Sequence, residues 1–263
     1  MNLALLVLTL AQLPRLTSGS VEQSAAGSNL GQQVRGFAGP TWVGYVVEAI
    51  PGQRGCCTSI NNGVYCALEG GMMGGGTCST ETAFLEGERT ANILFRVDDG
   101  DVQRVRVFSS WCQLDIGGLK FHWLTGVRPA DSVAFLRSLP VKSAFSAIAV
   151  HADASAESYL RETAESTSAP RNDRERAARA LASSRGPGGL AIVLKLLESE
   201  QDERLRESLP GAIAQAPNNS GTQALIDIAT RDKSRKVRER AFFWLGRSQD
   251  ARAKRFVEEI LSK

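Results

Sequence analysis

Apolar and polar positions follow a helical period through the second half of the chain. Four sets of apolar residues there recur at a spacing of 32 positions without a gap: Ala177, Leu209 and Ala241; Leu181, Ile213 and Leu245; Val193, Leu225 and Val257; Leu196, Ile228 and Ile260. Another step of 32 towards the N-terminus reaches a weaker fourth copy at Phe145, Ala149 and Leu160. Each copy contains two stretches with one apolar stripe, which is the pattern of two amphipathic helices. One such pair cannot bury both stripes, so residues 141–263 are predicted to form an α-solenoid of about four stacked pairs.

Residues 41–139 show strand patterns instead. Short β-branched and aromatic runs cover residues 41–50, 64–68, 91–97, 102–108 and 119–124. Two of these runs flank the segment 98–101, Asp-Asp-Gly-Asp, whose residues tolerate the positive φ of a tight hairpin turn. This stretch is therefore predicted to be a small, mostly antiparallel β domain that contains the cysteines.

The first 40 residues have the features of a leader and a linker. Residues 3–11 form an apolar run that is too short to cross a bilayer, which takes about 20 residues. Small residues follow, so the run fits the apolar part of a secretory signal, with cleavage after Gly19 or Ala26, although no Lys or Arg precedes it. Residues 1–26 are predicted to be a leader and residues 27–40 a flexible linker, in a chain exported to the periplasm or outside the cell without a membrane span in its mature form.

The net charge of +3 is unevenly distributed. From Arg171 onward there are 19 Lys and Arg against 13 Asp and Glu, so the predicted helices are mildly basic. This balance permits nucleic-acid binding but falls far short of a dense basic stripe, and we expect no nucleic-acid partner.

All five cysteines precede residue 113, which suggests a domain held by disulfides in an oxidising compartment. Four of them are disulfide candidates, and the preferred pairs are Cys57 with Cys66 and Cys56 with Cys112. Residues 61–63, Asn-Asn-Gly, could turn the chain between the first two partners. The adjacent Cys56 and Cys57 also leave open a thiol–disulfide redox role, although nothing nearby visibly lowers a thiol pKa.

Signals for catalysis, metal or cofactor binding are weak. His122 lies between Phe121 and Trp123 in a predicted strand, and the cysteines lack the Cys-x-x-Cys spacing of zinc ribbons. The glycine-rich residues 70–77 have no following lysine, so they do not fit a phosphate-binding loop. No Gly-x-Ser-x-Gly motif occurs. We therefore expect no catalytic residue, no metal and no cofactor.

The last predicted pair resembles the HEAT-repeat signature. The resemblance rests on residues 237–241, Val-Arg-Glu-Arg-Ala, on Trp244-Leu245-Gly246, and on Asp250 and Ala253. The arginine after the first apolar residue and the aspartate that opens the second helix are typical of that family. The sequence thus predicts an α+β protein by domain, with a small antiparallel β domain followed by a HEAT-like α-solenoid.

The whole chain also looks like bacterial HEAT-repeat domain-containing proteins that carry a signal peptide and a small cysteine-containing N-terminal region. Residues 110–118, Ser-Trp-Cys-Gln-Leu-Asp-Ile-Gly-Gly, and 122–124, His-Trp-Leu, carry this resemblance. It implies no established activity.

Three adjacent aromatic residues distinguish the last copy from the others. Phe242 and Trp244 are the candidates for contacting a partner, together with Arg238, although both rings could instead fill the core of the terminal pair. The predicted function is non-catalytic protein–protein binding by a module or scaffold, through the repeat surface, in the cell envelope or outside the cell. The alternative is an enzyme or thiol/disulfide redox protein that uses the N-terminal cysteines.

Overall fold

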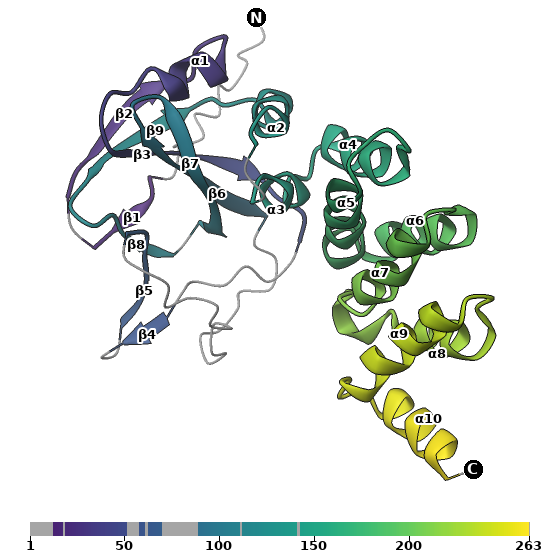
Figure 1. Ribbon diagram of the computed structural model, residues 1–263. Coiled ribbons are helices and arrows are strands. Elements are labelled where there is room, and N and C mark those ends of the chain that lie inside the picture. Colours follow the sequence, from purple (N-terminus) through teal and green to yellow (C-terminus); the bar gives the residue numbers. More distant parts are fainter. Residues whose placement is uncertain are drawn as a thin grey trace, which may run out of the picture. The chain divides into compact units, whose positions relative to one another are not determined.

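The computed structural model describes residues 13–17, 19–51, 58–60, 63–69, 89–110, 112–140 and 143–262 (Figure 1). The chain divides into two compact units, Met1–Ala147 and Ile148–Lys263. The division falls inside α3 (Ala144–Ala149), a few residues beyond the boundary expected at residue 140.

The first unit contains two sheets. The larger one has the strand order β2-β9-β3-β6-β7, with β2 (Val21–Ala25), β9 (Lys120–Thr125), β3 (Thr41–Glu48), β6 (Thr90–Asp98) and β7 (Asp101–Ser109). The smaller one has the order β1-β8-β5-β4, with β1 (Arg15–Leu16), β8 (Gln113–Asp115), β5 (Gly63–Ala67) and β4 (Thr58–Ile60).

The larger sheet is buried on both faces along its central strand β3. Trp42 and Trp123 are fully buried in a cluster with residues of the smaller sheet such as Leu114, so this core joins the two sheets. Gly44 allows the neighbouring strands to approach, because a Cβ there would lie 2.6 Å from Leu94 Cδ2 and 3.1 Å from Trp123 Cζ3. Burial on both faces explains why the run at residues 41–50 is almost continuously apolar.

Helix α2 (Pro129–Arg137) covers the opposite side of β3. Phe135 of α2 packs on Phe95, with ring centroids 5.2 Å apart, and Phe95 packs on Tyr45 at 5.6 Å. The Tyr45 hydroxyl lies 2.7 Å from Ser132 Oγ, and burial raises the pKa of this tyrosine. The hydrogen bond compensates the buried hydroxyl, as a buried polar group requires.

The predicted hairpin is confirmed. Strands β6 and β7 pair antiparallel around a turn in which Asp99 and Gly100 have φ values of 44° and 83°. Strands β3 and β9 occupy the runs predicted at residues 41–50 and 119–124. Local alternation and turn residues were sufficient to locate these elements.

The predicted fold class is wrong. The chain is a mixed α/β protein: β9 pairs parallel with both β2 and β3, and β8 pairs parallel with β1 and β5. Helices occur in both units, since α1 and α2 belong to the first, so an antiparallel β domain followed by an α-solenoid does not describe the chain. Parallel partners lie far apart in the sequence and are joined by no turn, so local patterns do not reveal them.

Three elements lie in the range predicted to be leader and linker: strands β1 and β2 and helix α1. Strand β2 pairs with β9 from Val21, opposite Phe121, to Ala25, opposite Thr125. Helix α1 (Leu30–Arg35) buries Leu30 and Val34, and its N-cap Asn29 accepts a hydrogen bond from Gln32 N. Cleavage after Gly19 would therefore remove β1 from the smaller sheet, and cleavage after Ala26 would also remove β2 from the larger sheet.

The second unit consists of antiparallel helix pairs. The first helices are α5 (Arg171–Ser184), α7 (Glu203–Ile213) and α9 (Arg235–Gly246), and the second helices are α4 (Ala154–Glu165), α6 (Gly186–Ser199), α8 (Thr222–Arg231) and α10 (Ala251–Leu261). Helix α7 lies beside both α5 and α9, which buries the apolar stripes of all three (Figure 1).

Candidate protein-binding surface

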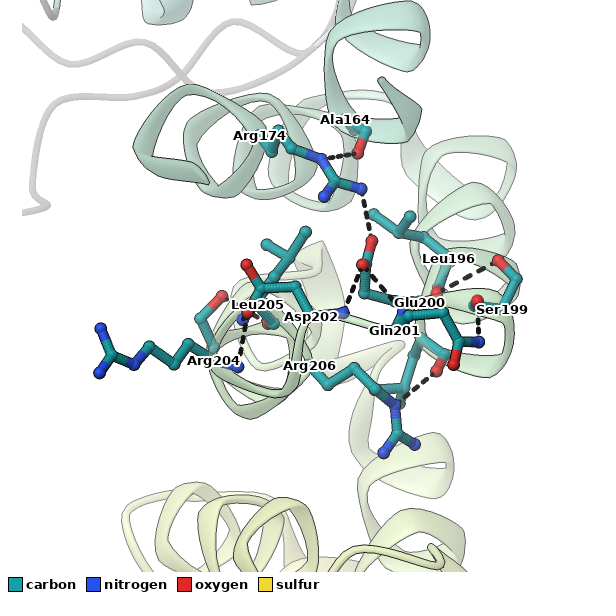
Figure 2. Close-up of polar contacts among 12 residues, drawn as sticks. Ala164, Arg174, Leu196, Ser199, Glu200, Gln201, Asp202, Arg204, Leu205 and Arg206 are labelled. Carbon is teal, nitrogen blue, oxygen red and sulfur yellow. Dashed lines mark hydrogen bonds and ion pairs between the residues drawn. The ribbon is translucent and has the colours of Figure 1, made fainter. Parts of the chain in front are cut away.

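A buried arginine connects three helices in the second unit. Arg174, the fourth residue of α5, is 5% exposed. Its Nε donates to the carbonyl oxygen of Ala164 in α4, 3.0 Å away, and its Nη2 donates to Glu200 Oε2 at the end of α6 (Figure 2). One guanidinium thus satisfies a helix-terminal carbonyl and a buried carboxylate.

The same contact recurs 32 residues later. Arg206, the fourth residue of α7, donates from Nε to Leu197 O at 3.1 Å and from Nη2 to both oxygens of Asp232, at 3.0 and 3.2 Å. Its side chain is 6% exposed and that of Asp232 is 10% exposed. We call Arg174–Glu200 and Arg206–Asp232 the two arginine bridges; each ion pair joins the two helices of one pair, and the Nε of the same arginine binds a carbonyl of the preceding pair.

The acids of both arginine bridges also bind backbone amides. Glu200 Oε1 accepts from Gln201 N at 2.9 Å and Asp202 N at 2.8 Å, and Asp232 Oδ1 accepts from Ser234 N at 2.8 Å. These carboxylates therefore hold the turn that leads into the next helix. A carboxylate with its oxygens occupied in this way stabilises the fold and is poorly placed to act as a catalytic base.

A cavity of about 350 Å³ lies beside the first arginine bridge. Arg174, Leu196 and Glu200 are the buried part of its lining, and the exposed part is Glu165, Thr167, Lys195, Ser199 and Gln201. The buried charges of the cavity are already bonded to each other, so it lacks an uncompensated group that would bind a small ligand.

Trp244, a predicted partner-binding residue, packs inside the helical unit. A Cβ on Gly211 of α7 would lie 3.1 Å from Trp244 Nε1, so the indole of α9 rests against the glycine backbone. Positions 210–212 are Pro, Gly and Ala, and the structure gives the physical reason for their size: the Trp244 side chain occupies the space beside them. Trp244 is partly buried and contributes to packing between α7 and α9.

The other two predicted residues also have internal contacts. Phe242 is partly buried, and its ring centroid lies 6.4 Å from that of Phe256 in α10. Arg238 continues the 32-residue series and donates from Nη1 to Asp232 O at 2.7 Å, at the end of α8. Each of the three predicted residues thus links α9 to a neighbouring segment.

The exposed aromatic residue of this helix is Phe243, which the sequence analysis did not select. It is 48% exposed, stacks edge-to-face on Trp244 at 5.5 Å, and lies 5.6 Å below the guanidinium of Arg247. A helical projection identifies it, since residue 243 lies opposite the buried stripe of Val237, Ala241 and Leu245. Arg174 was missed as well, although its distance of 32 from Arg206 was a usable signal.

Large exposed hydrophobic side chains gather on the last two helices. Among the residues that the structure describes, these are Leu13, Phe243, Ile260 and Leu261, and three of the four belong to α9 and α10. Their exposed fractions reach 74% at Leu261. Phe243 on α9 is the aromatic member of this group and is therefore the candidate contact residue.

The described cysteines are inside the first unit. Cys66 on β5 and Cys112 before β8 are fully buried in the core between the two sheets. Cys56, Cys57 and the glycine-rich residues 70–77 lie outside the described residues, so the two proposed disulfide pairs stay predictions. No cluster of potential metal ligands occurs among the residues that the structure describes.

His122 is a strand residue whose side chain is 14% exposed. Its ring stacks on Phe37 with centroids 4.1 Å apart, and its Nδ1 lies 3.2 Å from Glu22 Oε2 on β2. Loss of solvent lowers the pKa of His122, outweighing the opposite effect of Glu22 and adding to that of Lys120. The folded chain therefore prefers the neutral imidazole.

We expect the first unit to lose stability in mild acid because of His122. The pKa of His122 is lower in the folded chain than its unfolded value of 6.5, so stability is intact above pH 6.5. Below pH 6.5 the unfolded chain takes up the proton first, and the stability of the folded chain decreases. The urea midpoint should fall between pH 7.5 and 5.5, and His122→Gln should reduce the fall. An identical fall in the variant would assign the effect to other groups.

Comparison with known proteins assigns no family to this chain. The sequence matches no protein-family model, and no curated protein matches it. No described helix has the length and apolar character needed to cross a membrane.

Proposed function

We propose that this chain is a non-catalytic protein-binding module that uses the outer face of α9. The observation that carries the proposal is Phe243, an aromatic side chain that is 48% exposed on a helix whose other apolar residues are buried or partly buried. Aromatic side chains supply much of the binding energy at protein interfaces. Arg247 beside the ring adds a cation that a partner's carboxylate can pair with.

The arginine bridges support this proposal because they make a fixed frame. The buried charges of Arg174 and Arg206 join the two helices of one pair, and the Nε of each arginine binds a carbonyl of the preceding pair. A partner then meets a surface that has little conformational entropy left to lose on binding. The resemblance to HEAT repeats in residues 237–253 belongs to the same proposal.

The alternative, a redox protein, has less support. A thiol that exchanges with a substrate must be accessible, and Cys66 and Cys112 are both fully buried. Such a role would depend on Cys56, Cys57 or Cys78, and sulfhydryl reactivity of the native protein would test it.

The experiment that tests the proposed function is a capture assay with the full chain. Immobilised wild-type protein is expected to retain a defined protein from the envelope and culture-supernatant fractions of the source cells. Phe243→Ser should reduce the retention at least tenfold, because the loss of a central aromatic anchor costs about 2 kcal/mol or more. Quantitative mass spectrometry of the eluates measures it.

The matched control is Lys236→Ala on the same helix, an exposed residue that pairs with Glu207. This variant should retain the partner as wild type does. Equal retention by the Phe243→Ser variant, or equal loss in both variants, would contradict binding through Phe243.

We also propose export of the chain, on the strength of the apolar residues 3–11 and the small residues after them. Since β2 begins at Val21, a mature chain that starts near residue 20 keeps the larger sheet complete. N-terminal sequencing of the native protein decides the point, and a cytoplasmic chain that begins at Met1 would exclude export.

A further inference from the structure

The first helices α5, α7 and α9 present an outer face of equivalent positions. In α9 and its C-cap these positions are Lys236, Glu239, Arg240, Phe243 and Arg247, which lie within about 60° of Phe243 around the helix axis. In α7 and α5 they are the positions one and two periods of 32 residues earlier. We call this set the outer face; on α9 it lies opposite the buried stripe.

The acids of the outer face are compensated within the chain. Each one binds a base, with nitrogen–oxygen distances of 3.7 Å for Glu175 and Arg171, 3.1 Å for Glu207 and Lys236, and 2.7 Å for Glu239 and Arg235. Arg176 of the same face binds Asp173 beside it at 2.6 Å. These side chains therefore neutralise each other in pairs.

Four arginines of the outer face have no acidic partner in the part of the chain that the structure describes. They are Arg179, Arg204, Arg240 and Arg247, and all four are exposed. Glu203, the first residue of α7, is an exposed acid beside this face that forms no ion pair with a described residue. Four such bases against one such acid leave the outer face positive.

Phe243 lies between two of these bases. Arg240 precedes it by three residues, about one helical turn, and the guanidinium carbon of Arg247 lies 5.6 Å from the centroid of its ring. The surface around Phe243 therefore offers an apolar contact with a cation on either side. This arrangement is complementary to an apolar side chain that has carboxylates as neighbours.

The outer faces of the three helices lie next to one another. Helix α7 lies beside α5 and α9 (Figure 1), and the ion pair of Lys236 with Glu207 links the outer faces of α9 and α7. Axes of packed helices are about 8–10 Å apart, so Arg179 and Phe243, at equivalent positions of α5 and α9, are separated by about 20 Å. An extended chain covers that distance with about six residues. One short segment can therefore contact all three helices.

We propose that the outer face binds an acidic, extended segment of a partner protein that crosses α5, α7 and α9. This inference rests on the proposed function, because it names the chemistry of the partner that Phe243 contacts. An apolar side chain of the segment packs on Phe243, and its carboxylates bind the unpaired arginines, whose planar guanidinium groups match a carboxylate with two hydrogen bonds. The unpaired bases alternate with compensated acids and form no dense basic stripe, which favours a polypeptide over the closely spaced phosphates of a nucleic acid.

The probe for this surface is a peptide of alternating Glu and Ser with one Phe at the centre, in the register of the Glu residues. Alternation places the carboxylates and the ring on one face of an extended chain. Fluorescence anisotropy of the labelled peptide, titrated with the full-length protein at low salt, measures the dissociation constant. Wild type should bind this peptide at least tenfold more tightly than the same peptide with Gln in place of Glu, and added salt should reduce the difference.

Charge reversal of the protein tests the position of the site. Arg204→Glu/Arg240→Glu should weaken binding of the acidic peptide at least tenfold, because carboxylates then face carboxylates. The matched control is Arg161→Glu/Arg255→Glu, which reverses two exposed arginines of α4 and α10 and changes the net charge by the same amount. The control should bind the peptide as wild type does. Equal melting temperatures show that both variants are folded.

The proposal is overturned by equal affinity for the Glu and Gln peptides, by equal loss in the control variant, or by no binding at millimolar peptide. Tighter binding of a single-stranded DNA of the same charge would make a nucleic acid the occupant and would also overturn it. The Phe243→Ser variant separates this proposal from the proposed function. If that variant binds the acidic peptide as wild type does while Arg204→Glu/Arg240→Glu does not, binding through Phe243 fails and the acidic partner stands.

Discussion

Replacing Arg174 by leucine is expected to destabilise the helical unit by about 3–5 kcal/mol. The substitution leaves Glu200 buried, with a side chain only 6% exposed, and removes the cation that compensates it. It also leaves Ala164 O without its donor at the end of α4. Urea unfolding followed by circular dichroism measures the change.

Two further variants isolate the cause of that loss. In the double variant Arg174→Leu/Glu200→Gln the uncompensated charge is gone, while an amide oxygen can still accept from Gln201 N and Asp202 N. Most of the lost stability should return. Arg235→Ala, which breaks an exposed pair with Glu239, should cost less than about 0.5 kcal/mol. A double variant as unstable as the single one would show that charge compensation is not the reason.

Trp244→Ala is expected to cost about 3 kcal/mol, because the indole fills the space beside Gly211 between α7 and α9. Phe243→Ala on the same helix should cost less than about 0.5 kcal/mol, since its ring is half exposed. Thermal unfolding of the two variants compares a packing residue with a surface residue of similar chemistry.

Gly211→Ala provides an independent check on the same contact. Alanine is favoured over glycine in a helix by up to about 1 kcal/mol, but in wild type its methyl group would press on Trp244. The substitution should therefore stabilise the Trp244→Ala variant more than it stabilises wild type. Additive effects of the two substitutions would mean that positions 211 and 244 do not touch. A Trp244→Ala variant that is as stable as wild type but binds its partner poorly would mean that Trp244 contacts the partner.

The sequence predicted those elements that depend on neighbouring residues. The hairpin of β6 and β7 is specified by alternation and by Asp99 and Gly100, and the helices of the second unit by apolar residues at a fixed period. The parallel pairing of β3 with β9 was not predictable in this way, because 79 residues separate Thr41 from its partner Lys120. That missing information made the predicted fold class wrong.

The sequence located the candidate surface on α9 but did not identify which of its residues are exposed and which are packed inside. Periodicity located α9 and its aromatic residues, and a helical projection places Phe243 opposite the buried stripe, but neither shows that Trp244 faces Gly211 of α7. Which side of a helix meets a neighbour depends on how adjacent pairs pack. Arg174 and Glu200, in contrast, could have been identified from the sequence. Each has an equivalent 32 residues later, at Arg206 and Asp232, so a repeat analysis that included charged residues would have found both arginine bridges.

The order of strands in the larger sheet has a consequence for the newly made chain. Strands β6 and β7 are adjacent in sequence and can pair as soon as Ser109 has been added. Strand β3 can pair with β6 at that stage, but β2 neighbours only β9 in this sheet, so Val21 has no strand partner until Phe121 exists, 100 residues later. Contacts this distant close slowly. A ribosome that stalls before residue 120 therefore holds a chain whose strand β2 is unpaired, and such a chain is a substrate for proteases and chaperones until β9 emerges.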